Sequence, residues 1–282
     1  MTDTTDRVLR YYSPNPAKEW VRLESLDTGP IEFELTTRRL REHLAPGSRV
    51  LDIGGGPGRY TLWLAAHGHR VTLADRVPEL LGEARARIEA AGLASNVEDV
   101  VVADVCDLSA WADQSFDAAL CLGPFYHLPE AERRERAASE VARVLRPGGL
   151  LFAAFMPRLG FFKRTMATRE EWAHLRDREF VASLSEHGSF LNDNPGRFDA
   201  GYGAWPEEIA PLFAARGFET VSLLAAESFA PPVSEQLAAM ATADPESYAA
   251  ALDILETHAA DSSILGTANH LLYIGRRVSS AR

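Results

Sequence analysis

A glycine-rich loop after a short apolar run constrains this chain most. The run 49–53 has the composition of a buried strand, and the loop Gly54-Gly-Gly-Pro-Gly58 follows it directly. A glycine turn between a strand and a helix lets the backbone approach a ligand closely, and ligands of open α/β sheets bind at this edge. The loop therefore predicts an α/β fold with a ligand site at the carboxyl end of the first strand.

β-rich runs and helical stretches alternate along most of the chain, which is typical of a parallel sheet with crossover helices. We expect strands over 49–53, 70–75, 97–104, 116–122, 150–155, 218–224 and 269–276. We expect helices over 60–67, 78–91, 129–145, 206–215 and 247–258. Between residues 156 and 203 the alternation stops, and there we expect helical pieces and loops but no clear strand.

The charge balance bears on the partners of the protein. Forty acidic residues against 29 basic ones give a net charge of −11. Proteins that grip phosphate backbones usually present a basic surface, so we do not expect nucleic acid as a partner. The first ten residues lack the apolar segment of a secretory signal, no long apolar run suggests a membrane span, and the two cysteines suit a reducing compartment. We expect a cytoplasmic protein without membrane contact or a metal site.

Three details separate this loop from that of dinucleotide-binding enzymes. Its spacing is Gly-x-Gly-x-Gly with Pro57 inside, rather than Gly-x-Gly-x-x-Gly. Asp52 precedes the turn, where a carboxylate suits an ammonium group better than a pyrophosphate. Asp75 ends the second expected strand, where it can hold both hydroxyls of a ribose. A ligand with an ammonium group, a ribose and an adenine but no phosphate is S-adenosylmethionine.

From about residue 48 to 155 the chain resembles the class I S-adenosylmethionine-dependent methyltransferases, in their bacterial small-molecule and secondary-metabolite branch. Five motifs in the family's order carry the resemblance: 50–58, Asp75, 103–105, 115–117 and 144–149. The resemblance implies a doubly wound, Rossmann-like sheet of seven strands in the order 3-2-1-4-5-7-6, the last strand antiparallel, with a helical substrate cap. It divides the chain into an N-terminal helical segment that covers the cofactor, a cofactor-binding core, a substrate cap insertion and the rest of the sheet, at 1–47, 48–155, 156–205 and 206–282.

The resemblance also implies roles for single residues around the cofactor. Asp75 would take the ribose hydroxyls, and Asp104 would accept a hydrogen bond from the adenine amino group. Asp104 has an alternative role as the N-cap of a short helix after it. Tyr12 would reach the methyl-donor region, or would only pack. The full set of expected cofactor contacts is Tyr12, Asp52, Gly54, Gly56, Gly58, Asp75, Arg76, Asp104, Val105 and Leu122.

The loop after the fourth expected strand is where related enzymes face the transferring methyl group. The methyl donor is already activated, so a base is needed only if the acceptor arrives with a proton to lose. His127 in this loop is the best candidate base, with Tyr126 beside it and Glu170 as a further candidate. The alternative for His127 is a structural role at the start of the following helix.

The segment expected to form the cap opens with basic residues and is rich in aromatic ones. This composition suggests a hypothesis in which Arg158, Lys163, Arg164 and Arg169 hold an anionic group of an apolar or planar substrate, against the alternative of a solvated helix. The candidate substrate contacts are Tyr11, Arg164, Arg169, Trp172, Tyr202 and Trp205.

The sequence thus predicts an enzyme, a monomer or homodimer, that transfers a methyl group from S-adenosylmethionine to an oxygen, nitrogen or carbon atom of a small molecule, in secondary metabolism. One alternative is C-methylation of an anionic isoprenoid such as a prenyl diphosphate through a carbocation, with Glu170 or Glu171 removing the proton. The others are a protein or RNA methyltransferase, a cofactor-binding protein without catalysis, and an NAD-dependent dehydrogenase, which the glycine spacing disfavours.

Overall fold

The central strands are apolar along nearly their whole length because helices cover both faces of the sheet. The computed structural model describes residues 4–14, 16–25, 28–191 and 200–278. Its main strands are β1 (Arg49–Ile53), β2 (Arg70–Asp75), β3 (Val97–Val102), β4 (Phe116–Cys121), β5 (Leu145–Pro157), β8 (Phe218–Ala225) and β9 (Leu271–Arg277). They lie in the order β3-β2-β1-β4-β5-β9-β8.

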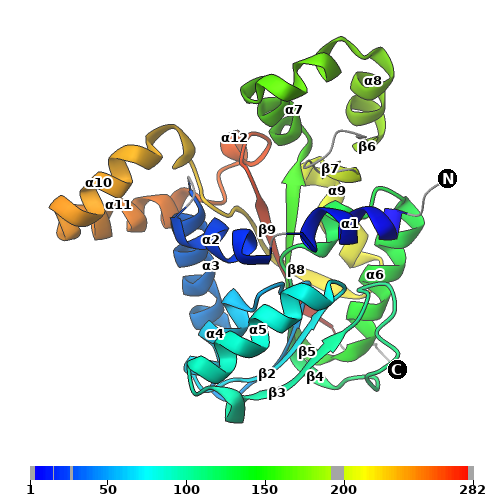
Figure 1. Cartoon of the computed structure of the whole chain (residues 1–282), viewed down its shortest axis with the longest axis vertical. Coiled ribbons are helices and arrows are strands. Elements are labelled where there is room, and N and C mark those ends of the chain that lie inside the picture. Colours follow the sequence, from blue (N-terminus) through cyan, green and yellow to red (C-terminus); the bar gives the residue numbers. More distant parts are fainter. Residues whose placement is uncertain (1–3, 15, 26–27, 192–199, 279–282) are drawn as a thin grey trace.

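The last strand enters the sheet between two earlier ones (Figure 1). β9 pairs antiparallel with β5, from Leu150 opposite Arg276 to Phe155 opposite Leu271, and antiparallel with β8 on its other side. The strands from β3 to β5 pair parallel. Counted over the main sheet, this is the predicted order 3-2-1-4-5-7-6 with an antiparallel last strand, so the fold prediction is confirmed.

Two helical layers sandwich the sheet. On one face lie α3 (Gly29–His43), α4 (Arg59–Ala66) and α5 (Pro78–Ala90), where Leu40 and Leu64 pack on Val50. On the other face lie α6 (Ala131–Val144) and α9 (Pro206–Ala214), where Phe213 packs against Phe155. Side chains that alternate along one strand therefore point to opposite faces of the sheet and pack in two separate hydrophobic cores. The short η1 helix (Ala94–Asn96) leads into β3.

The cap differs from the sequence prediction, because it contains two strands. Helices α7 (Arg158–Ala167), η3 (Arg169–Arg176) and α8 (Arg178–His187) are followed by β6 (Ser189–Leu191) and β7 (Ala200–Ala204). β5 runs on to Pro157, and its tip pairs with Gly203 and Ala204 of β7. The sequence hides these strands because β6 has only three residues and β7 contains two glycines, which weaken strand propensity.

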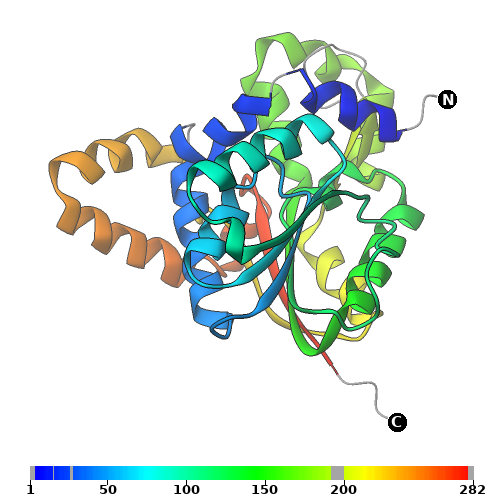
Figure 2. The ribbon, with the colours of Figure 1, turned by 60° about the horizontal axis from the view of Figure 1, so that its bottom comes forward.

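The remaining helices lie outside the layers. α1 (Thr4–Tyr12) and α2 (Pro16–Ser25) cross the carboxyl edge of the sheet, where α1 packs against β7 and α2 against α3 and α5. Figure 2 shows this pair beside the cap, and it also shows the hairpin of α10 (Ser234–Ala243) and α11 (Pro245–His258) standing away from the sheet. The η4 (Pro231–Val233) and α12 (Ser262–Leu265) turns flank that hairpin. None of the described helices has both the length and the apolar composition needed to cross a bilayer.

Candidate functional site

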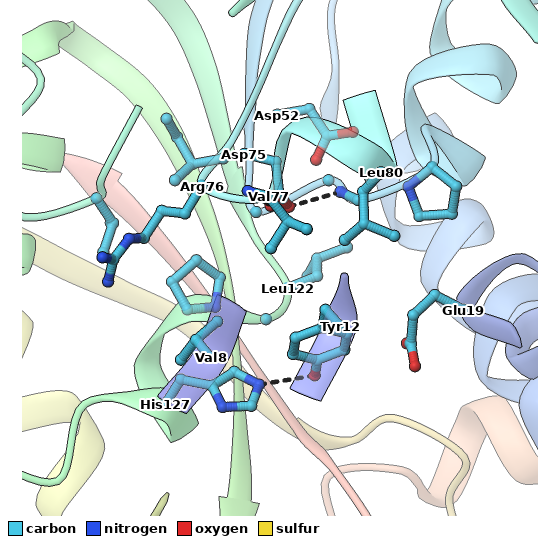
Figure 3. A pocket seen from close by; sticks show the side chains of 18 of the residues that line it. Val8, Tyr12, Glu19, Asp52, Asp75, Arg76, Val77, Leu80, Leu122 and His127 are labelled. Atoms are coloured by element: carbon cyan, nitrogen blue, oxygen red, sulfur yellow. Dashed lines mark hydrogen bonds between the residues drawn. The ribbon is translucent and has the colours of Figure 1, made fainter. Parts of the chain in front are cut away.

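A pocket lies at the carboxyl edge of the sheet, beneath α1 and α2. It holds about 1000 Å³ of empty space, including its open mouth. The glycine loop after β1 lines it together with the end of β2, the loop after β3 and the η2 helix (Pro124–His127) (Figure 3). Because the parallel strands all end at this edge, the residues that follow them share one space. The pocket thus lies where the glycine loop predicts a ligand site.

The glycine loop needs glycine at three positions. Gly54, Gly56 and Gly58 have φ angles of +69°, +56° and +83°, the left-handed region that glycine adopts without steric cost. Gly54 and Gly56 line the pocket. Gly58 does not line it: this residue is the N-cap of α4, and its backbone faces Ala84 of α5.

Asp52 lies at the pocket wall under the loop, with only 1% of its surface exposed. Its carboxylate accepts a hydrogen bond of 2.7 Å from the hydroxyl of Thr61. Burial and, to a smaller extent, the nearby Asp75 raise the pKa of Asp52 to about 6, against the opposing effect of the Thr61 hydrogen bond. Loss of hydration disfavours the charged carboxylate, so a cation arriving in the pocket would stabilise its ionised form.

Asp75 ends β2 and is held in place by two backbone amides. Its two carboxylate oxygens accept hydrogen bonds from Gly56 N–H and Val77 N–H, both of 2.9 Å. Burial raises the pKa of Asp75, and these amide hydrogen bonds oppose the shift. Each carboxylate oxygen can accept more than one hydrogen bond, so the fixed carboxylate retains acceptor sites for hydroxyl groups in the pocket.

Asp104 follows β3 and is held by positive charge. Its Oδ1 accepts a hydrogen bond from Cys106 N–H at 2.9 Å, and Arg133 and Arg76 lie 3.0 and 3.4 Å from its other carboxylate oxygen, Oδ2. No helix follows Asp104, so the alternative role as a helix N-cap is wrong. Asp104, Arg76 and the buried Val105 all line the pocket, as the sequence predicts for an adenine site.

The segment after β4, which includes the η2 helix, brings three expected residues to the pocket. Leu122, Tyr126 and His127 all line it. The Tyr126 hydroxyl donates to the carbonyl oxygen of Leu122 at 3.3 Å. His127 lies within the last turn of η2, and helix α6 begins only four residues later at Ala131.

Tyr12 reaches the pocket from α1, as expected. Its hydroxyl forms a hydrogen bond of 2.8 Å with His127 Nε2 across the pocket (Figure 3). Burial raises the pKa of Tyr12 well above its ordinary value, and burial lowers the pKa of His127 to about 3. The phenol therefore keeps its proton and the imidazole is neutral at physiological pH. Tyr11 stacks edge-on against Tyr12 and does not line the pocket.

Helices α2 and α4 contribute charged pocket residues that the sequence analysis missed. Glu19, Arg22 and Arg59 line the pocket. Burial raises the pKa of Glu19, although Arg22 opposes the shift. Each charge lies on an amphipathic helix, where most charged residues are solvated, and only the packing of α2 over the sheet turns Glu19 and Arg22 inward. Arg59, directly after the glycine loop, was the one residue whose position in the sequence pointed to the site.

The other cap candidates lie away from the pocket, at the start of the cap. Arg164 is 3.8 Å from Glu171 within the cap. Arg169 and Glu170 are exposed, and Trp172 is 51% exposed with its ring N–H donating to the carbonyl of Met166. None of these described side chains lines the pocket. Their roles toward a substrate remain predictions.

Tyr202 and Trp205 contact an ion pair between the buried Arg158 and the exposed Glu208. Arg158, only 2% exposed, donates to both carboxylate oxygens of Glu208 at 3.0 Å. Tyr202 donates its hydroxyl to the same carboxylate, and the Arg158 guanidinium lies over the Trp205 ring. Arg158 therefore serves the packing of α7 on α9, which removes it from the expected anion-binding group.

The chain is similar in sequence and in fold to known proteins. Residues 51–153 match a family model described as a methyltransferase domain. Residues 51–153 thus form a methyltransferase domain that is similar to those of S-adenosylmethionine-dependent methyltransferases. The cofactor of such a domain is S-adenosylmethionine, and the glycine loop, Asp75 and Asp104 of this chain fit its parts.

Two curated relatives match the methyltransferase domain and its surroundings. The ubiquinone biosynthesis O-methyltransferase of Xanthomonas oryzae pv. oryzae (strain PXO99A) is 39% identical over 130 residues, which are 46% of this chain and 50% of that protein. Methyltransferase GfsG of Streptomyces halstedii is 36% identical over 155 residues, 53% of this chain and 51% of that protein. The matched part of this chain spans about half the length of each relative.

Solved structures share the methyltransferase fold over most of the chain. The S-adenosylmethionine-dependent methyltransferase of Methanosarcina mazei has a TM-score of 0.57 at 20% identity, over 85% of this chain and 97% of that one. The 1,6-didemethyltoxoflavin-N1-methyltransferase of Burkholderia thailandensis, solved with its substrate and S-adenosylhomocysteine, has a TM-score of 0.54 at 18% identity, over 98% and 87%. At these identities the likeness is one of fold.

Proposed function

We propose that this protein transfers a methyl group from S-adenosylmethionine to a small-molecule acceptor. The observation that carries the proposal is a row of three carboxylates, Asp52, Asp75 and Asp104, at the ends of the adjacent strands β1, β2 and β3. Their order matches the ammonium group, the ribose and the adenine amino group of this cofactor. When bound, the cofactor supplies an electrophilic methyl group, so the protein has mainly to align the acceptor with it.

The basic residues of the pocket support the same ligand. Arg22 and Arg59 line the pocket together with Asp52. The Nε atom of Arg59 is buried and has no hydrogen-bond partner among the described residues. A buried donor without a partner is costly, so a ligand acceptor at this place is favourable. We assign it to the carboxylate of the cofactor's methionine part, with Arg22 as the second cation.

We assign the acceptor to the side of the pocket formed by η2 and α1. The neutral ring of His127 has one nitrogen with a lone pair, and the burial that lowers its pKa makes the ring a weak base; Tyr126 lies next to it. We propose residues 1–47 as the segment that covers the cofactor and residues 156–205 as the substrate cap. The names of the Xanthomonas and Burkholderia proteins indicate small-molecule substrates, which supports a small-molecule acceptor here.

The prenyl diphosphate alternative is not favoured by the cap residues. It needs a cluster of cations for the diphosphate, but Arg158 is bound to Glu208 and Arg164 lies beside Glu171. We therefore favour an oxygen or nitrogen atom of the substrate over a carbon atom as the methyl acceptor. The exposed position of Glu170 does not support a role as the base.

Titration calorimetry tests the cofactor assignment. We expect micromolar binding of S-adenosylmethionine and S-adenosylhomocysteine and no binding of NAD. Asp75→Ala should abolish binding of both adenosyl ligands. Asp99→Ala, which removes an exposed carboxylate from neighbouring β3, should leave it unchanged. Binding of NAD, or failure of the folded wild-type protein to bind either adenosyl ligand, would refute the proposal.

A further inference from the structure

The hydrogen bond between Tyr12 and His127 joins two elements that are far apart in the sequence. Tyr12 lies in the last turn of α1, and His127 in η2 directly after β4. The hydroxyl oxygen and Nε2 are 2.8 Å apart, and the two rings meet edge-on with 5.4 Å between centroids. Both side chains line the pocket (Figure 3). The bond therefore connects α1, which lies over the pocket, with η2 at the end of β4.

The protonation states of the two groups, together with the imidazole tautomer, set the direction of this bond. The Tyr12 hydroxyl keeps its proton, because burial and the nearby Tyr126 and Glu19 raise its pKa. The His127 ring is neutral, because burial lowers its pKa. A neutral imidazole has one nitrogen that accepts and one that donates. With Nε2 as the acceptor, Tyr12 is the donor, and its oxygen retains lone pairs that can accept a proton from the pocket.

We propose that Tyr12 is a catalytic residue, whose hydroxyl takes a proton from an O–H or N–H acceptor while passing its own proton to His127 Nε2. This inference rests on the proposed methyl transfer and names its acceptor class. His127 Nε2 is already occupied by Tyr12, so a proton from the acceptor reaches it only through the Tyr12 oxygen. The Tyr126 hydroxyl donates to the Leu122 carbonyl and does not complete this path.

The step balances without a further reactant. An acceptor lone pair forms the new bond to the methyl carbon, and the sulfur–carbon bond breaks with its electron pair remaining on sulfur. The acceptor O–H or N–H bond breaks towards the Tyr12 oxygen, and the Tyr12 O–H bond breaks towards His127 Nε2. The product pair is a methylated neutral acceptor and an imidazolium, which releases its proton to solvent. The site thus carries one positive charge before and after the transfer.

The path exists only while α1 covers the pocket. Ser13, the residue after Tyr12, donates its hydroxyl to Glu79 of α5 at 3.0 Å and helps to hold the end of α1 over the site. A base that is completed by the lid removes the acceptor proton only when the pocket is closed against water. The same helix, α1, therefore both covers the pocket and supplies the Tyr12 hydroxyl of the proton path.

Steady-state kinetics of single and double variants test the relay. Wild-type enzyme would be assayed by S-adenosylhomocysteine release with phenol, an aromatic amine, an acidic nitrophenol that is already ionised at the assay pH, and a prenyl diphosphate. We expect Tyr12→Phe and His127→Asn each to lower kcat for phenol by about 10²-fold, the usual size of general-base catalysis. The double variant should be no slower than the slower single one, since both residues serve one proton path.

The nitrophenol separates proton transfer from positioning. It has no proton to lose, so Tyr12→Phe should slow its methylation by no more than about 3-fold, against about 10²-fold for phenol. Tyr248→Phe removes a hydroxyl in α11, outside the pocket, and should change neither rate. Equal slowing of phenol and nitrophenol, or turnover by the wild type of the prenyl diphosphate alone or of no O–H or N–H acceptor, would overturn the relay.

Two measurements without turnover separate this inference from the proposed function. By calorimetry, Tyr12→Phe should keep its S-adenosylhomocysteine affinity within about 3-fold of wild type; a large loss would make Tyr12 a cofactor contact instead. In nitrogen-15 spectra of the S-adenosylhomocysteine complex, assigned with His127→Asn, we expect a proton on His127 Nδ1 and none on Nε2. A proton on Nε2 would contradict the relay, whereas absence of cofactor binding to wild type would refute the function itself.

Discussion

Asp52 and Gly55 are packed closely against each other at the base of the pocket. The carboxylate of Asp52 lies so close under the loop that a Cβ atom on Gly55 would be 2.5 Å from its oxygen and 2.5 Å from a methyl group of Leu73. The loop can therefore cover a buried carboxylate only if this residue has no side chain. The backbone of Gly55 is not left-handed, so its need for glycine comes from packing.

Gly55→Ala should destabilise the protein by about 2 kcal/mol, the usual cost of forcing an extra group into a packed region. The matched control is Gly82→Ala, at an exposed position of α5 where nothing lies within 4 Å of the added atom. That change should stabilise by about 0.5–1 kcal/mol, because alanine is the better helix former. Urea unfolding of both variants gives the comparison, and similar free energies of unfolding for the two would contradict it.

The raised pKa of Asp52 makes stability depend on pH in a defined direction. The folded protein holds the Asp52 proton up to about pH 6, whereas the unfolded chain releases it near pH 3.8. Between these values the folded state binds more protons, so this group's contribution to stability falls as pH rises. The full effect corresponds to about 3 kcal/mol. Asp52→Asn should gain stability relative to wild type by up to that amount between pH 4 and 7, in denaturant unfolding without ligand. A difference that stays constant with pH would mean that Asp52 ionises normally.

At the scale of elements, the ring of Trp20 helps to hold α2 over the pocket. Trp20 lies between the guanidinium groups of Arg59 and Arg87, which are 4.6 and 3.9 Å from its ring centre. Each such contact contributes about 0.5–2 kcal/mol. Trp20→Ala should weaken S-adenosylhomocysteine binding by about 10-fold, measured by calorimetry, because the lid would open more easily.

The control for the lid uses a tryptophan in the same kind of contact. Trp63 lies beneath the Arg41 guanidinium and stacks on His67, within the α3–α4 layer. Trp63→Ala removes comparable interactions without touching α2, so cofactor affinity should remain near that of wild type. Equal losses of affinity in the two variants would show that Trp20 acts through general stability and not through the lid.

The cap depends on the buried Arg158 and its ion pair with Glu208. Arg158 also donates to the carbonyls of Gly203 and Ser185, so one side chain ties α7 to β7, α8 and α9. Arg158→Ala would leave the carbonyl oxygens that it binds without their donor and should cost about 1–3 kcal/mol. Arg169→Ala, in the exposed η3 turn, should change stability by no more than about 0.5 kcal/mol. Thermal unfolding of the two variants distinguishes a structural arginine from a surface one.

The elements of the core were predictable because each has a strong local signal. Apolar runs bounded by glycine and acid mark β1 and β2, and Pro78 and Gly92 bracket α5. The missed elements lack such signals. β6 and β7 become strands only by pairing with each other and with the tip of β5, and the alanine-rich α10 is paired with α11. Long-range pairing, which no short window of sequence contains, decides these segments.

At the scale of the whole molecule, the residues of the site also fall into two groups: those that local sequence signals predict and those that only long-range packing places. Asp75 and Asp104 were predictable because strand ends always meet at one edge of a parallel sheet. Glu19 and Arg22 were not, because their direction depends on how a lid helix packs over an edge that lies far away in the sequence. The hydrogen bond from Tyr12 to His127 spans 115 positions and becomes visible only in the assembled fold.

The position of β9 makes the sheet depend on its last strand. β9 lies between β5 and β8 and pairs with both, and its residues Tyr273 and Ile274 are fully buried. A chain stopped at residue 268 loses both pairings and this part of both cores. It should not fold, which circular dichroism and the loss of a cooperative unfolding transition would show. A folded truncated protein that binds S-adenosylhomocysteine would contradict this central role.

The same topology determines in which order the paired strands become available while the ribosome synthesises the chain. The ribosome makes β5 more than a hundred residues before the strand that will cover its edge, and β8 also has to wait for that strand. Until β9 emerges, two open strand edges face a gap of one strand's width, a state that invites pairing with other chains. Nascent chains of this protein are thus most exposed to aggregation late in translation, when most of the cofactor-binding half is already made, and that is the stage at which a chaperone would matter most.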